Sequence, residues 1–179
     1  DDLADVRLIR EQVDRCRQIL NQMATDVGAG VGESWVTRSA RAWISAAAEG
    51  LPGQERLEIS VGANEEVVGP RPALAQALRS LLRNALQSSI APVQVRLVGE
   101  RLEVHDAGAG MSTEVLARAG EPFFTTKSPG EGLGLGLYLS RAVITQLGGG
   151  LELTSRHGEG TVAVLVLPAA AIRHSRADV

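Results

Sequence analysis

Two glycine clusters bracket the segment of this 179-residue chain that could bind a phosphorylated ligand. The first follows Asp106 as Ala-Gly-Ala-Gly, and the second, residues 130–136, leads directly into a predicted helix. Glycine permits positive φ and close main-chain approach, and a helix N-terminus offers unpaired N–H groups to a phosphate. In other proteins such clusters only allow helices to pack closely. This pattern alone therefore leaves both phosphate binding and helix packing open. The second cluster does not match a dinucleotide-binding fingerprint, because a long loop precedes it instead of a strand.

Two polar residues could act beside these clusters. Asp106 ends an apolar strand, and its carboxylate could either cap the following turn or accept a hydrogen bond from an exocyclic amine such as that of adenine. Asn84 lies on a predicted helix with Ser80, Gln87 and Ser88 as its neighbours at three and four residues. An amide oxygen is a hard ligand that suits Mg²⁺, although Asn84 could also be a solvated helix residue.

Rare residue types gather between the clusters. Lys127 is the only lysine among 18 basic residues, and the only two phenylalanines are the neighbours Phe123 and Phe124. Three rare residues within five positions suggest a local role, such as a point charge for a phosphate, with a surface charge as the alternative for Lys127.

Composition excludes several classes of protein. A hydrophobic content of 44% with 22% charged residues is typical of a globular domain, and a net charge of -3 provides no field for nucleic acid. The sequence contains no uninterrupted run of about 18 apolar residues, so no membrane span is predicted in it. The first residues lack the pattern of a secretory signal. The single cysteine, Cys16, favours a reducing compartment.

Hydrophobic spacing divides the chain into elements. Residues 1–24 have apolar residues at alternating steps of three and four, which predicts a coiled-coil-like helix that packs on a dimer mate or in a bundle. Packing of this helix on its own domain is the alternative. Glycine-rich residues 26–34 indicate a linker, and a helix ending at Ala48 is expected to place Trp35 and Trp43 in the core.

The remaining pattern predicts further strands, two hairpins among them, and two helices. Strands are expected at residues 56–61, 93–98, 101–106, 151–154 and 161–167, with hairpins joining the second to the third and the fourth to the fifth. A helix is expected at residues 72–89, with Leu74, Leu78, Leu81 and Ala85 as its core stripe, and another at 133–147. Residues 107–132 form a long loop, and the tail from 169 is expected to fray. The fold class is therefore α+β, with one sheet covered by helices on one face.

Taken together, these motifs resemble the catalytic, ATP-binding domain of sensor histidine kinases, within the superfamily shared with gyrase, Hsp90 and MutL. Leu-Leu-Arg-Asn-Ala at 81–85 is similar to the N box, Asp-Ala-Gly-Ala-Gly at 106–110 to the G1 box, and Pro-Phe-Phe-Thr-Thr-Lys at 122–127 to the F box. Gly-Leu-Gly-Leu-Gly-Leu at 132–137 is similar to the G2 box and Gly-Glu-Gly-Thr at 158–161 to the closing element. The resemblance covers residues 35–168, with the boxes in the family's order.

The resemblance implies a two-layer α/β sandwich of the Bergerat type and a role for each matched residue. Asn84 would coordinate the Mg²⁺ that bridges the phosphates of ATP. Asp106 would bind the adenine amino group, with Thr161 supporting its carboxylate, and Gly108 and Gly110 would let the main chain close on the base. Lys127 would reach the phosphates, so that Asn84 and Lys127 are the expected catalytic residues. The residues expected to surround the phosphates are Gly132, Leu133, Gly134, Leu135, Gly136 and Leu137.

Residues 111–131 would be the ATP lid, whose end the rings of Phe123 and Phe124 would anchor in the core. The chain departs from the family pattern at three positions of the N-box helix. Ser80 stands where asparagine is frequent, Gln87 where lysine is frequent, and Ser88 where an aromatic residue is frequent. The missing lysine removes a phosphate contact, for which Arg118 and Lys127 are the candidate replacements.

Family members carry a phosphorylatable histidine on the first helix of a dimerising hairpin, and His105, His157 and His174 do not fit that position. Residues 1–25 resemble the second half of the hairpin, so the expected organisation is a hairpin fragment, a linker at 26–34, a catalytic domain at 35–168 and a tail at 169–179. The runs 10–20 and 136–142 are most similar to the redox-responsive RegB/PrrB subgroup.

The function that the resemblance implies is transfer of the γ-phosphoryl group of ATP to a histidine in two-component signalling. The implied partners are a response regulator and a second copy of the full-length protein, with no nucleic acid and no direct membrane contact by these residues. The implied location is the cytoplasmic portion of an inner-membrane-anchored bacterial kinase. The alternatives are a non-catalytic ATP-binding regulator of the same fold and a serine kinase of the anti-sigma-factor type.

Overall fold

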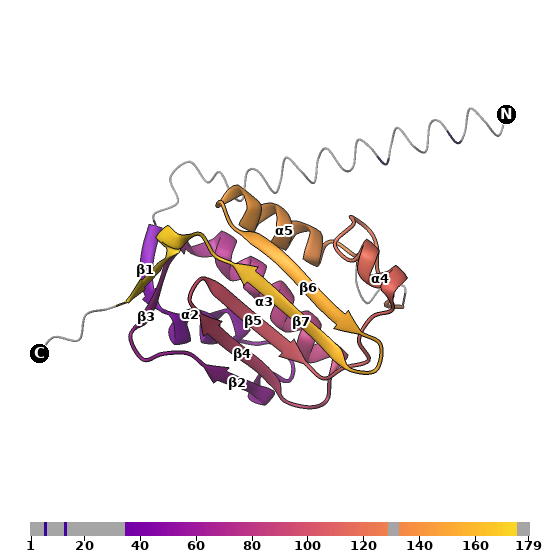
Figure 1. Cartoon of the computed structure of the whole chain (residues 1–179), viewed down its shortest axis with the longest axis horizontal. Coiled ribbons are helices and arrows are strands. Elements are labelled where there is room, and N and C mark those ends of the chain that lie inside the picture. The colour runs from indigo at the N-terminus through magenta and orange to yellow at the C-terminus, as the bar shows by residue number, and fades with distance from the viewer. Residues whose placement is uncertain (1–5, 7–12, 14–34, 129–132, 175–179) are drawn as a thin grey trace, which may run out of the picture.

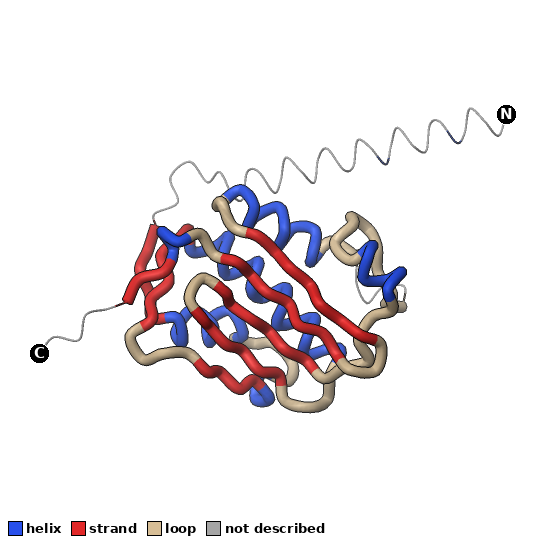
Figure 2. The backbone as a smooth tube through the Cα atoms, viewed as in Figure 1, coloured by secondary structure: helices blue, strands red, loops and turns tan. Residues whose placement is uncertain are grey.

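The computed structural model describes residues 6, 13, 35–128 and 133–174, and the described residues from 35 onward form two layers. One layer is a five-stranded sheet, and helices cover one of its faces (Figure 1). A three-stranded sheet, which contains the first and the last strand of the domain, lies beside the helices at one end (Figures 1 and 2). This confirms the predicted α+β sandwich.

The order of the elements along the chain is close to the one that the hydrophobic pattern predicts. The helices are α2 (Ala40–Ala48), α3 (Arg71–Ser88), α4 (Thr113–Arg118) and α5 (Gly136–Gln146), with short 3-10 turns at Gln54–Arg56 and Ala169–Ala171. The strands are β1 (Trp35–Ser39), β2 (Leu57–Ser60), β3 (Glu65–Pro70), β4 (Val93–Val98), β5 (Arg101–Asp106), β6 (Gly150–Arg156), β7 (Gly160–Val166) and β8 (Ile172–His174).

The strand order of the large sheet brings the ends of distant segments together. Its order is β2-β4-β5-β7-β6, in which β2 is parallel to β4 and the other neighbours are antiparallel. The predicted hairpins β4–β5 and β6–β7 are both present. Because β5 pairs with β7, Asp106 at the end of β5 lies opposite Thr161 at the start of β7.

Helix α3 forms the centre of the helical layer. Its predicted core stripe is buried, with exposed fractions of 4% or less at Leu74, Leu78, Leu81 and Ala85. These side chains pack with residues of the large sheet such as Leu102 into one cluster. Burial of apolar surface contributes a stabilising free energy of about 25 cal/mol per Å². The buried stripe therefore holds α3 in one position on the sheet.

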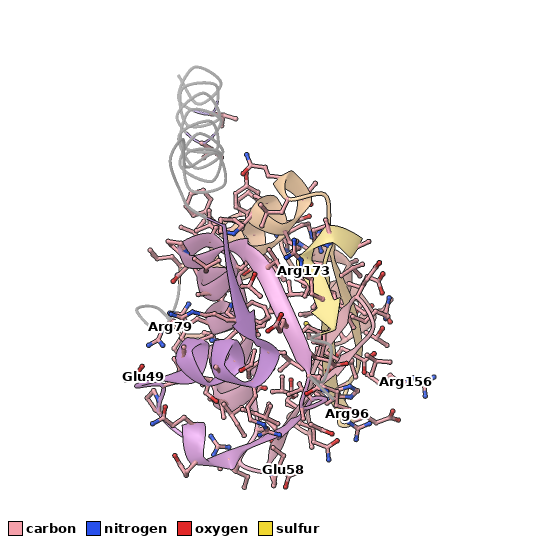
Figure 3. The ribbon with its side chains drawn as sticks, turned by 90° about the vertical axis from the view of Figure 1, so that its left-hand side faces the viewer. Glu49, Glu58, Arg79, Arg96, Arg156 and Arg173 are labelled. Atoms are coloured by element: carbon pink, nitrogen blue, oxygen red, sulfur yellow. The ribbon has the colours of Figure 1, made fainter. Side chains whose placement is uncertain are left out.

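Two arginines bind the C-terminal ends of helices, where main-chain carbonyls lack helical partners. Arg79 donates to the carbonyl oxygens of Ala47 (3.1 Å) and Glu49 (2.7 Å), on the helical side of the domain that faces away from Arg96 and Arg156 (Figure 3). Arg56 donates to the carbonyl oxygens of Leu86 (2.8 Å) and Ser89. The two hydrogen bonds of Arg56 fix the C-terminal end of α3, which carries the candidate site.

The prediction that Trp35 and Trp43 lie in one helix ending at Ala48 is wrong for Trp35. Residues Trp35–Ser39 form β1, which pairs antiparallel with β3, a strand that the sequence pattern did not predict. The helix begins only at Ala40, because the Ser39 hydroxyl caps it by accepting from the N–H of Ala42 at 3.2 Å. Trp43 is buried as predicted.

Two other expectations change. The tail does not fray at residues 169–174, because β8 pairs with β3 and Ala171 is buried. The long loop after β5 contains α4, which the Ser112 side chain caps by accepting from the N–H of Val115. The linker and most of the predicted coiled-coil helix lie outside the described residues; Val6 and Val13 are helical and exposed.

Candidate nucleotide-binding site

Asn84 and Lys127 meet although 43 residues separate them in the sequence. The half-buried ammonium of Lys127 donates to Oδ1 of Asn84 at 3.4 Å and also to Oε1 of Gln87. Asn84 and Gln87 project from the last turns of α3, and Lys127 follows the paired phenylalanines. The structure therefore places the F-box lysine directly against the N-box helix.

Asp106 lies at the same end of the sheet and holds the first glycine turn. Its Oδ1 accepts a hydrogen bond from the N–H of Gly108 at 2.9 Å, so the capping role considered for this carboxylate is present. A Cβ on Gly108 would lie 2.4 Å from the carbonyl oxygen of Ser88. Only glycine lets this turn approach the end of α3 so closely, which brings the G1 box beside the N box.

Gly110 is the second position where a glycine is required. It has a φ of 63°, and a Cβ there would lie 1.9 Å from the carbonyl oxygen of Arg156. The β6–β7 turn is hydrogen-bonded to the residue before Gly110, since the N–H of Gly158 donates to the carbonyl oxygen of Ala109 at 2.7 Å. The β6–β7 turn and the G1 box therefore pack main chain against main chain.

Ser155 is a residue of this region that the sequence analysis missed. Its hydroxyl donates to the carbonyl oxygen of Gly160 (2.8 Å), accepts from the N–H of Met111 (2.9 Å) and contacts Oγ1 of Thr161 (2.9 Å). Because its one hydrogen goes to Gly160, Thr161 is the donor in the last bond. The expected support of Asp106 by Thr161 remains a prediction, since the described residues show no bond between these side chains.

The described part of the G2 box contacts both the F box and α3. Gly134 has a φ of 70°, and a Cβ on it would lie 2.5 Å from the carbonyl oxygen of Phe124. Gly136 begins α5, and a Cβ there would lie 2.5 Å from Oγ of Ser80, a buried hydroxyl without a hydrogen-bond partner in the described residues.

The remaining G2 positions differ in exposure. Leu133 is exposed, whereas Leu135 and Leu137 are half-buried and Leu137 packs against the main core. Gly132, also expected at the phosphates, lies outside the described residues.

The expectation that both phenylalanine rings anchor the lid in the core is wrong. Phe123 is 46% exposed and has a φ of 66°, and neither ring belongs to the buried core clusters. Phe124 is half-buried and is covered by Arg118, whose guanidinium carbon lies 4.1 Å from the ring centroid. Arg118 also pairs with Glu121 at 3.1 Å. Of the two candidate replacements for a lysine at position 87, Lys127 hydrogen-bonds to two residues of α3, whereas Arg118 interacts with Glu121 and Phe124 in its own segment.

Shifted carboxyl groups occur on α4 and on the large sheet. The Ser112 hydroxyl lowers the pKa of Glu114 by hydrogen bonding, and the hydrogen bond from Arg101 lowers the pKa of Glu152. His105 contacts Glu103 at 2.9 Å on β5, while His157 is exposed in the β6–β7 turn. Neither histidine lies on a helix, which agrees with their exclusion as phosphate acceptors.

Comparison with known proteins identifies the family. Residues 69–171 match the model of the histidine kinase-, DNA gyrase B- and HSP90-like ATPases, and the chain belongs to this family of ATP-binding domains. The matched range contains every motif of the site, from α3 to the β6–β7 turn.

Similar proteins include sensor kinases. The sensor protein FixL of Bradyrhizobium diazoefficiens is 31% identical over 175 residues, covering 89% of this chain and 34% of FixL. The sensor histidine kinase RegB of Cereibacter sphaeroides is 30% identical over 172 residues, covering 84% of this chain and 37% of RegB. The chain thus spans about a third of each relative. These matches confirm the resemblance to sensor histidine kinases, whereas the RegB/PrrB subgroup stays a prediction because FixL matches equally well.

Solved structures agree on the fold. The crystal structure of full-length ShkA in complex with AMPPNP superposes with a TM-score of 0.67 at 22% identity, covering 97% of this chain and 39% of that one. The mycobacterial sensor histidine kinase MprB has a TM-score of 0.62 at 23% identity, covering 79% of this chain and all of the other.

Among the described residues, none of the helices has the length and apolar character that a membrane span requires.

Proposed function

We propose that this domain binds ATP with Mg²⁺ and presents the γ-phosphoryl group to a histidine of a dimerising helical domain in two-component signalling. The observation that carries the proposal is the convergence of Asn84, Lys127, Asp106 and Gly108 at one end of the fold. These residues come from three segments of the chain, namely α3, the G1 box and the F box. Membership of the ATPase family supports adenine nucleotide as the ligand.

The residues present fit a divalent cation at the phosphates. Oδ1 of Asn84 already faces a positive charge, the ammonium of Lys127 at 3.4 Å, so a cation can reach this oxygen. Mg²⁺ prefers oxygen ligands and is commonly held by one or two protein groups together with substrate phosphates. Bound there, Mg²⁺ would neutralise the phosphates and withdraw charge from the transferring group.

The chain's own residues would mainly orient the nucleotide. Asp106 would accept a hydrogen bond from the adenine amine through the carboxylate whose Oδ1 holds the Gly108 turn. Lys127 would bind the phosphates as a point charge, and the N-terminus of α5 would direct its main-chain N–H groups at them. Phosphoryl transfer depends chiefly on positioning and charge stabilisation, so the domain needs no nucleophile of its own.

The proposed partners are a response regulator and, in the full-length protein, a second copy that pairs through the coiled-coil-like helix. The proposed location is the cytoplasmic side of the inner membrane. Ser80 and Gln87 favour a second candidate, an ATP-binding regulator that transfers no phosphate, because both depart from the kinase pattern.

Phosphohistidine formation separates these two functions. The chain is mixed with ATP, Mg²⁺ and a separately produced dimerising histidine domain, and label that is stable in base but labile in acid is expected on the acceptor. An acceptor in which glutamine replaces the phosphorylatable histidine is the control. Folded, ATP-bound chain that never labels the acceptor would favour the regulator, and acid-stable label on serine would favour the anti-sigma-type kinase.

A further inference from the structure

We infer that Gln87 is a positioning residue that holds the ammonium of Lys127 beside Asn84, so that the site takes its fixed positive charge from the F box instead of from α3. This inference rests on the proposed binding of ATP. It assigns a role to Gln87, which the family pattern identifies only as a position where a lysine is missing.

The contacts that carry the inference come from two acceptors on one face of α3. Asn84 and Gln87 are three residues apart, so their side chains lie on neighbouring turns of the same helix face. Both amide oxygens accept from the single ammonium of Lys127. Hydrogen bonds to a charged group are the stronger kind, and two of them fix the otherwise flexible lysine side chain.

The alternative source of charge is already engaged elsewhere. Arg118 lies over the ring of Phe124 and pairs with Glu121 within its own segment, whereas Lys127 reaches across to α3. Oε1 of Gln87 lies within hydrogen-bonding distance of Nζ of Lys127. The end of a side chain at position 87 therefore lies next to the ammonium of Lys127. A lysine at position 87 would therefore deliver its own ammonium to nearly the same point.

The inference predicts a charge swap. In EDTA, where no Mg²⁺ shares the charge of the phosphates, Lys127→Met should weaken ATP binding about tenfold and leave AMP binding unchanged. Gln87→Lys added to Lys127→Met should restore ATP affinity to within about threefold of the wild type. Both affinities are measured by competition with a fluorescent adenine nucleotide.

The positioning role of Gln87 has its own readout. Gln87→Met should weaken metal-free ATP binding about threefold in the wild-type background and have no effect in the Lys127→Met background, because there is then no ammonium to hold. Gln76→Lys, at an exposed position of the same helix, adds the same charge away from the site and should not rescue Lys127→Met.

Three results would overturn the inference while leaving ATP binding intact. These are an equal loss of ATP and AMP affinity in Lys127→Met, a rescue by Gln76→Lys as large as that by Gln87→Lys, and an undiminished effect of Gln87→Met in the Lys127→Met background. A wild-type chain that binds no ATP would instead overturn the proposed function together with this inference. AMP binding reports that each variant is folded.

Discussion

Replacing Asn84 by alanine is expected to abolish magnesium-dependent phosphoryl transfer in a protein that also carries the acceptor histidine, while the domain stays folded. Removing a group that binds the metal at the developing charge should cost at least about 100-fold in rate. The side chain of Asn84 is only half-buried, and its described hydrogen bond is the one at 3.4 Å to Lys127. The expected loss of stability is therefore below about 1 kcal/mol.

The measurement is the rate of phosphohistidine formation at saturating Mg²⁺, with a thermal melt of the same sample. Asn64→Ala, which removes an exposed amide between β2 and β3, is the matched control and should transfer phosphate at the wild-type rate. Transfer by Asn84→Ala within a factor of about three of wild type would show that this amide is no ligand.

Asp106→Asn is expected to weaken ATP binding by about 10-fold to 100-fold, because a charged acceptor for the adenine amine is lost. The change keeps the size of the side chain, and the amide oxygen can still accept from the N–H of Gly108. It therefore separates the ligand-binding role from the turn-capping role, which alanine would remove together.

Calorimetry with ATP and GTP measures both the affinity and the preference for adenine. The variant should bind ATP more weakly and discriminate less against GTP, with a melting temperature close to that of the wild type. Unchanged ATP affinity in a folded Asp106→Asn variant would reduce this carboxylate to its structural role in the turn.

Sequence periodicity predicted the parts of the fold that local burial determines. The stripe on α3 and the alternation of β4 and β5 are visible within each segment, since one face of each element is buried. Strands β1 and β3 were missed because they are defined by pairing with each other and with β8 across the chain. Their short sequences, one ending in Gly-Pro, carry little strand signal of their own.

The site was predictable as a set of residues but not as a set of contacts. Asn84, Asp106 and the glycines were found from their types and spacing, and the structure brings those among the described residues to one end of the fold. The contact between Lys127 and Gln87 spans 40 residues and depends on how the F box folds over α3. Ser155 was missed because its role follows from the register that places it opposite Thr161.

The paired phenylalanines show why composition misleads about burial. Their rarity drew attention to a segment that contacts α3 through Lys127. Adjacent residues of an irregular loop, however, need not point the same way. Phe123 has a positive φ and an exposed ring, whereas Phe124 is covered by Arg118. Side-chain direction in such a loop is set by its packing, which no periodic pattern encodes.

Titration calorimetry of the folded chain with a non-hydrolysable ATP analogue and Mg²⁺ tests the central claim most directly. Binding heat with one nucleotide per chain is expected, and it should weaken when Mg²⁺ is removed. Absence of binding heat at millimolar nucleotide, from protein shown to be folded by its melting transition, would contradict the assignment of this site to ATP.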